Sequence, residues 1–121
     1  MSKVIGIVGS RRRNGKEDLF AVAAALAKVY EAGDTLVSGG CPKGGDRFAE
    51  ILSAKQDIPI KIYPAEWNKY GRSAGFKRNG FIAADSDILI ACVAPDRTGG
   101  TEDTIKKFLA KGKHEEDLIL V

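Results

Sequence analysis

Three short glycine-rich segments carry the residue types that hold phosphate groups in proteins. They are Gly9-Ser10-Arg11, the stretch from Ser38 to Asp46, and the stretch from Pro95 to Thr101. Glycine lets the backbone come close to a ligand, and an arginine can donate two parallel hydrogen bonds to phosphate oxygens. None of the three matches the GxGxxG dinucleotide motif or the P-loop. We therefore expect an anion site that the three segments build together.

The second and third segments each run directly into a predicted helix. A helix N-terminus exposes unpaired N–H groups and the positive end of the helix dipole, which together favour an anion. Asp46 and Thr101 have a second interpretation as helix caps. We favour the cap for Asp46, and the alternative is that it accepts hydrogen bonds from ribose hydroxyls. The predicted ligand-binding residues of the three segments are Gly9, Ser10, Arg11, Gly39, Gly40, Lys43, Gly44, Gly45, Asp46, Gly99, Gly100 and Thr101.

A longer segment, residues 64–78, combines aromatic and basic residues. Trp67 and Tyr70 are candidates for stacking on a base, since stacking tolerates any base; the alternative is that they pack this segment onto the sheet. Arg78 and Asn79 lie one turn into the helix that follows. Arg78 is the best single candidate for a phosphate contact, and Asn79 is a candidate for a base or ribose contact.

The spacing of apolar residues predicts the elements that position these side chains. Five short apolar runs predict buried strands at 4–8, 35–39, 60–64, 88–94 and 118–121. Between them, helical spacing predicts four helices. The alternation predicts one α/β domain over residues 1–121, a three-layer sandwich in which helices cover both faces of a five-stranded parallel sheet. Right-handed crossovers then bring all strand-to-helix loops to the carboxyl edge of the sheet, where ligands bind in such folds.

Polar residues and glycines predict where these helices begin and end. Asn14, with Glu17 three residues later, is the expected start of the first helix, and Gly33 its end. The other three helices are expected to begin at Asp46, Ser73 and Thr101, and Gly112 to close the last one.

Charge is divided between the two edges of this predicted sheet, although the net charge is only +3. The carboxyl-edge loops hold eleven basic and seven acidic residues, and the opposite loops hold three basic and eight acidic residues. A positive edge attracts anions to the place where a ligand is expected. The carboxyl-edge loops are residues 10–18, 39–47, 64–78 and 94–103; the opposite loops are 31–35, 53–60, 85–87 and 111–117.

Several classes of protein are disfavoured by the composition. Cys41, Cys92 and the single histidine, His114, show no metal-ligand spacing, so we expect no metal site and no disulfide. No apolar run approaches the roughly 20 residues of a membrane helix. The first strand begins almost at Met1 and leaves no space for a signal peptide, so we expect a cytoplasmic location.

Four motifs together carry a resemblance to a known family. GSR, GGCPKGGD, PAEWNKYGRSAGFKRN and RTGGTEDT, in this order, resemble the DUF2493 branch of the SLOG superfamily, from the first strand through the fourth helix. The resemblance implies a Rossmann-like sheet with strand order 3-2-1-4-5. It also implies a pocket for a nucleotide or a nucleotide-derived ligand. We expect that no cofactor is required. Since related small domains often pair, we expect a homodimer.

The resemblance extends to two groups with different activities. The Lonely Guy phosphoribohydrolases release a base from a nucleoside monophosphate and carry an arginine before a Gly-Gly-x-Gly-Thr-x-x-Glu motif. Arg78 matches the arginine, and Gly99 to Thr101 match part of the motif, but the glutamate position is occupied by Thr104. Glu102 and Asp103 are nearby carboxylates out of register, and they are the remaining catalytic candidates.

The DNA-processing protein A family, which binds single-stranded DNA, shares a Ser-Gly…Gly-x-Asp loop. Ser38, Gly39, Gly45 and Asp46 resemble that loop. Our expectation is therefore a sensor or binding protein for a phosphate-bearing, nucleotide-derived small molecule. One alternative is an N-glycoside hydrolase acting on nucleotides. The second is a single-stranded nucleic-acid module, which is less expected because the basic residues are divided among short loops and interleaved with acids.

Overall fold

The protein is built on one sheet of five parallel strands in the order β3-β2-β1-β4-β5. The structure is a computed structural model that describes residues 2–121. The strands are β1 (Val4–Gly9), β2 (Thr35–Ser38), β3 (Ile60–Ile62), β4 (Ile88–Cys92) and β5 (Leu118–Leu120). The α/β class, the all-parallel sheet and the strand order expected from the sequence are thereby confirmed.

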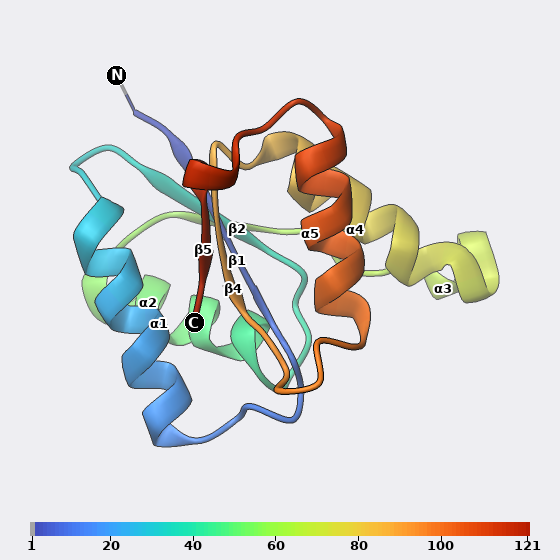
Figure 1. Ribbon diagram of the computed structural model, residues 1–121, viewed down its shortest axis with the longest axis horizontal. Coiled ribbons are helices and arrows are strands. Elements are labelled where there is room, and N and C mark those ends of the chain that lie inside the picture. Colours follow the sequence, from blue (N-terminus) through green and yellow to red (C-terminus); the bar gives the residue numbers. More distant parts are fainter. Residues whose placement is uncertain (1) are drawn as a thin grey trace.

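Helices cover both faces of the sheet (Figure 1). One face carries α1 (Lys16–Val29) and α2 (Gly45–Gln56), and the other carries α4 (Ala74–Asp85) and α5 (Gly100–Ala110). The sequence did not predict the short helix α3 (Trp67–Tyr70), which continues into the 3-10 turn η1 (Gly71–Ser73) and projects to one side of the sandwich. A second 3-10 turn, η2 (Glu115–Asp117), precedes β5.

The alternation of side chains along the strands separates two apolar cores. Ile5 and Ile7 of β1 pack with Phe48 of α2 beneath the α1–α2 layer. Val8 points to the other face and packs with Phe108 of α5. β1 lies in the middle of the sheet and is buried on both faces, so its carboxyl end is firmly held. The loop that follows Gly9 therefore starts from a fixed position.

Three helices begin at glycines rather than at the polar residues expected to cap them. Gly15, Gly44 and Gly99 occupy the N-cap positions of α1, α2 and α5. Gly44 has φ 76° and Gly99 has φ 106°. Residues other than glycine adopt this backbone conformation only at a cost in free energy, because of their Cβ atom. The cap predictions for Asp46 and Thr101 are therefore wrong: each lies one residue inside its helix.

The boundaries of α1 also differ from the expected ones. Asn14 does not cap this helix, because its Oδ1 accepts hydrogen bonds from Gly44 N (2.8 Å) and from Arg47 Nη1 (3.0 Å). The carboxylate that accepts from the N-cap backbone is Asp18, at 3.2 Å from Gly15 N, rather than Glu17. The helix ends at Val29, before Gly33.

The remaining two boundary predictions agree with the structure in position. Ser73 is the N-cap residue of α4, although its hydroxyl donates to Tyr70 O (2.9 Å) and not to the helix. Gly112 follows the end of α5 with φ 78°.

Both cysteines are free thiols, and burial raises the pKa of the Cys92 thiol. Within residues 2–121, the longest apolar helical stretch falls short of what a membrane crossing requires.

Candidate functional site

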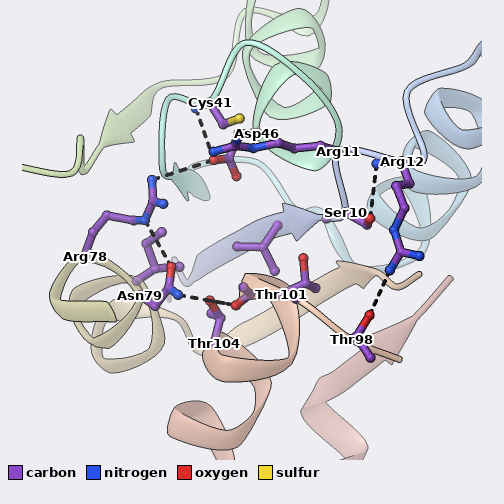
Figure 2. A pocket seen from close by; sticks show the side chains of 15 residues that line it. Ser10, Arg11, Arg12, Cys41, Asp46, Arg78, Asn79, Thr98, Thr101 and Thr104 are labelled. Carbon is purple, nitrogen blue, oxygen red and sulfur yellow. Dashed lines mark hydrogen bonds and ion pairs between the residues drawn. The ribbon is translucent and has the colours of Figure 1, made fainter. Parts of the chain in front are cut away.

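A cavity of about 290 Å³ opens at the carboxyl ends of β1, β2 and β4 (Figure 2). In the strand order β3-β2-β1-β4-β5, the chain leaves β1 in one direction and later continues on its other side, so this is the switch point where open α/β sheets bind ligands. The cavity is lined by Val8, Gly9, Ser10, Arg11, Arg12, Cys41, Asp46, Arg78, Asn79, Ile82, Thr98, Gly99, Gly100, Thr101 and Thr104.

The N-terminus of α5 forms one open wall of this cavity. A Cβ atom added at Gly99 would meet no atom within 4 Å, and one added at Gly100 would meet only Asn79 Nδ2 at 3.9 Å. The N–H groups of the first helical turn have no acceptor within the helix. The backbone donors of Gly100 and Thr101 are thus accessible to a group that enters the cavity.

Arg78 forms the opposite wall, and its guanidinium is held by the protein. Nη1 donates to Gly39 O (2.9 Å), Nε donates to Asn79 Oδ1 (3.0 Å), and Asp46 Oδ2 lies 4.0 Å from Nη1. Asn79 in turn donates to Asp103 Oδ2 at 3.1 Å. This network ties α4 to the loop after β2 and to α5, and it keeps a positive charge on the cavity wall.

The loop after β2 is packed against the end of β1. A Cβ atom at Gly45 would lie 2.3 Å from the carbonyl carbon of Val8, and one at Gly44 would lie 2.4 Å from Ser10 O. The N-terminus of α2 therefore rests directly on the backbone of β1, and these two glycines permit that contact. Of the residues predicted to bind the ligand, the structure does not place Gly39, Gly40, Lys43, Gly44 and Gly45 on the cavity lining.

Among the described residues, Asp46 is the only carboxylate on the cavity lining. Its Oδ1 lies 2.9 Å from the Ser38 hydroxyl, and its Oδ2 accepts from Cys41 N at 3.1 Å. The carboxylate thus closes the loop after β2 onto the first turn of α2.

The three consecutive arginines after β1 have three different environments. Arg12 forms a two-pronged ion pair with Asp96 (2.7 and 3.0 Å) and also donates to Thr98. The hydrogen bonds that Asp96 accepts from Arg12 and from the Thr98 hydroxyl (2.7 Å) hold the pKa of Asp96 well below its usual range. Arg13 donates to Asp18 at 2.9 Å. The exposed Arg11 has no hydrogen-bond or ion-pair partner among residues 2–121, and Figure 2 shows its side chain reaching over the cavity.

The two carboxylates considered for catalysis lie off the cavity. Glu102 is paired with Arg97 (2.8 and 2.9 Å), and Asp103 accepts from Lys107 Nζ (2.8 Å) as well as from Asn79. Thr104, at the position of the family glutamate, does line the cavity.

The two aromatic residues considered for stacking are not on this lining either. Trp67 lies in α3 with 58% of its surface exposed. Tyr70 lines a separate hollow and lies beneath Lys69 and Lys77, whose Nζ atoms are 5.1 and 4.8 Å from the ring centroid.

The structure does bring together all six predicted residues from the first and third glycine segments with Arg78, Asn79 and Asp46. Six lining residues were not predicted. Arg12 and Thr98 lie next to predicted residues in the sequence, and their guanidinium and hydroxyl groups could have identified them as ligand-binding candidates. Val8 and Ile82 are apolar, so their residue types gave no indication of a place on the cavity lining. The six are Val8, Arg12, Cys41, Ile82, Thr98 and Thr104.

The sequence matches no protein-family model and no curated protein. The fold is similar to that of the molybdenum cofactor binding protein from the phototrophic bacterium Rippkaea orientalis, with a TM-score of 0.72 and 20% sequence identity. The similarity covers 99% of this chain and 76% of that chain. At this identity, the comparison establishes a common fold.

Proposed function

We propose that the protein binds a phosphate-bearing nucleotide or nucleotide-derived ligand in the cavity at the carboxyl edge, as a sensor or binding protein. The observation that carries the proposal is the open N-terminus of α5, which faces a cavity that is also lined by two arginines, Arg11 and Arg78. A phosphate there would accept hydrogen bonds from the N–H groups of Gly100 and Thr101 and from the Thr101 hydroxyl. Arg11 and Arg78 would neutralise its charge.

The size and chemistry of the cavity agree with a small organic anion. Its volume of about 290 Å³ is close to the lower end of the range for small-molecule sites, about 300–1,000 Å³. The structurally similar protein is named for binding the molybdenum cofactor. Residues 2–121 offer donors for a phosphate, and they hold no group of three His, Cys, Asp or Glu side chains that could bind a metal ion.

We also propose that the chain belongs to the DUF2493 branch of the SLOG superfamily and acts as one ligand-binding domain in the cytoplasm. The confirmed strand order supports this placement. A homodimer is part of the same proposal, because Trp67 and Phe76, which are 58% and 57% exposed, leave aromatic surface on α3 and α4. Light scattering at micromolar concentration tests it, and a monomer mass would contradict it.

Nucleotide hydrolysis is less well supported. A glycosidase needs a carboxylate beside the reacting carbon. Glu102 and Asp103 are engaged outside the cavity, and Asp46 is held by Ser38 and Cys41. We expect no free base when AMP is incubated overnight with the protein and followed by chromatography. Base release that disappears in Asp46→Asn, Glu102→Gln or Asp103→Asn would favour the enzyme.

Thermal unfolding with added ligands tests the binding proposal. Nucleoside mono- and diphosphates, cyclic nucleotides, nucleotide sugars and the molybdenum cofactor should be compared with free bases. The phosphorylated ligands should raise the melting temperature, because a ligand at a hundred times its dissociation constant stabilises the fold by about 2.7 kcal/mol. No shift across this panel would contradict the proposal. A steep fall in affinity with salt for oligonucleotides, but not for mononucleotides, would favour the nucleic-acid alternative.

Arg78→Ala sharpens this test. The variant should bind the ligand about 10- to 100-fold more weakly, which corresponds to the 1.5–3 kcal/mol typical of hydrogen bonds to charged groups. Arg72→Ala is the matched control, since Arg72 is exposed in η1 and does not line the cavity. If the two variants bind the ligand with equal affinity, Arg78 does not contact it.

A further inference from the structure

A second hollow of about 320 Å³ lies on the other side of Arg78 from the cavity described above. Its α4 wall consists of Ala74, Lys77, Arg78 and Phe81, which share one face of the helix by their spacing. The other wall comes from the end of β3 and from α3. The complete lining is Tyr63, Pro64, Glu66, Tyr70, Ala74, Lys77, Arg78 and Phe81.

Aromatic rings dominate this hollow. The rings of Tyr63 and Phe81 have centroids 5.6 Å apart and are tilted by 31°. Lys77 Nζ lies 4.8 Å from the centroid of Tyr70, and Phe81 remains 49% exposed. Such an open aromatic surface with a cation beside it is suited to a flat, electron-rich heterocycle.

Arg78 is common to both spaces and separates them. Its hydrogen bond to Gly39 O holds the guanidinium between them, and a Cβ atom at Gly39 would lie only 2.4 Å from Nη1. A nucleotide joins a heterocyclic base to a phosphate through one ribose, and here the two linings share one residue, Arg78. A space suited to an anion and a space with an aromatic lining thus adjoin at this residue.

We propose that the second hollow holds the heterocyclic base of the same ligand whose phosphate binds at α5. This inference rests on the proposed function and specifies its ligand class. The base would lie against Tyr70 and Phe81, and Arg78 would contact the ligand at the junction. Glu66 is the carboxylate on this lining, and it would accept hydrogen bonds from an exocyclic amino group, which favours adenine- or guanine-like ligands.

Calorimetric titration with AMP, GMP and ribose 5-phosphate separates the two halves of the site. AMP or GMP should bind at least tenfold more tightly than ribose 5-phosphate. In Tyr70→Ala and in Phe81→Ala, that nucleotide should bind about 5- to 100-fold more weakly, the range that follows from the cost of removing one stacking residue. Ribose 5-phosphate should bind these variants as it binds the unchanged protein. In Arg78→Ala, both ligands should weaken.

Phe20→Ala is the matched control, because Phe20 is 65% exposed on α1, on the other face of the sheet. Its affinities should not change. The melting temperature of each unliganded variant shows whether Phe81→Ala disturbs its packing on Tyr63; Tyr70→Ala, in the short helix α3, does not depend on that contact.

The outcomes distinguish the two proposals. If ribose 5-phosphate binds and neither nucleotide binds more tightly, the base is not held in the hollow and this inference is wrong, while the phosphate site stands. If none of the three ligands binds, this inference is wrong, and the proposed function is then decided by the wider panel of ligands in the thermal unfolding test. If Tyr70→Ala and Phe81→Ala leave nucleotide affinity unchanged but alter the mass in light scattering, the hollow is an interface between copies of the chain, and the base lies elsewhere.

Discussion

Two glycine pairs stand at equivalent positions, each at the N-terminus of a helix, and have different structural roles. Gly44-Gly45 and Gly99-Gly100 are the N-cap and first residues of α2 and α5, and both N-cap glycines have positive φ. At Gly45 there is no room for a Cβ atom, because the backbone of Val8 lies 2.3 Å away. At Gly100 the nearest atom is 3.9 Å away. One pair serves packing, and the other leaves a helix N-terminus open.

The residue after each pair reinforces the difference. Asp46 follows Gly45, and its carboxylate is used by Ser38 and Cys41, so the protein supplies its own negative charge at the start of α2. Thr101 follows Gly100, and its hydroxyl makes no hydrogen bond within residues 2–121. The first turn of α5 also carries two carboxylates, Glu102 and Asp103, but they are paired with Arg97 and Lys107 and lie off the cavity. A carboxylate of the cavity lining is therefore bound at the start of α2 and, within the described part of the chain, none is bound at the start of α5.

The largest effect should come from Gly45→Ala. The new methyl group would overlap the backbone of β1, which cannot move aside as a side chain can, so we expect a loss of about 3 kcal/mol in the free energy of unfolding. Urea unfolding measures it. Gly100→Ala is the matched substitution and should change stability by less than about 0.5 kcal/mol. Similar losses of stability in the two variants would contradict the claim that only the pair at α2 is needed for packing.

A variant that loses stability without losing ligand binding is needed as a reference, and Asp34 at the opposite edge of the sheet provides one. Burial alone would raise the pKa of Asp34, but hydrogen bonds from Lys3 Nζ (2.6 Å) and from the N–H groups of Lys3 and Glu31 (both 2.8 Å) outweigh it and hold the pKa below 3.8. Asp34→Asn should cost about 1–3 kcal/mol at neutral pH and leave ligand affinity unchanged.

The pH dependence of this variant has a definite sign. A carboxylate with a lowered pKa stabilises the fold above its unfolded pKa, and the contribution is lost as the pH falls through the folded value. The difference in stability between the unchanged protein and Asp34→Asn should therefore be constant above about pH 5 and shrink below about pH 4. A difference that grows on acidification would contradict the assignment.

Gly100→Ala should have the opposite phenotype to Gly45→Ala. Its methyl group would enter the space in front of α5 where the phosphate is proposed to lie, so we expect about tenfold weaker binding, or 1.4 kcal/mol, with little change in melting temperature. Calorimetry with the best nucleotide from the thermal panel measures it. Unchanged affinity would mean that the ligand does not approach this helix.

An effect of similar size on affinity is expected of Thr101→Val, which keeps the shape of the side chain and removes the hydroxyl. One hydrogen bond to a charged group contributes at least about 1.5 kcal/mol, so affinity for the phosphate-bearing ligand should fall about tenfold. Stability should not fall, since no protein partner is lost within the described residues. A loss of stability without a loss of affinity would show that the Thr101 hydroxyl supports the fold.

The strands could be predicted because their apolar runs are unambiguous: VIGIV and ILIAC are buried on both faces, and no other element fits them. The helix α3 could not, because four residues of WNKY have no apolar period. Arg78 and Asn79 were predicted toward the sheet edge, since they follow directly from the start of α4. The different roles of the two glycine pairs could not be predicted from the sequence. They depend on how closely Gly45 approaches the backbone of Val8, and this contact between distant parts of the chain is not visible in the local sequence.

The position of β1 has a consequence for how the chain folds. This strand is made first and lies at the centre of the sheet, yet half of its ladder requires β4, with Ile5 opposite Ile88 and Gly9 opposite Cys92. Contacts so distant in sequence slow folding, because the intervening chain must be ordered before they form. During synthesis, one edge of β1 stays unpaired until β4 has emerged, and its apolar residues are exposed to association with other chains. The strand whose carboxyl end lines the cavity therefore completes its pairing only after residues 88–92 have been made.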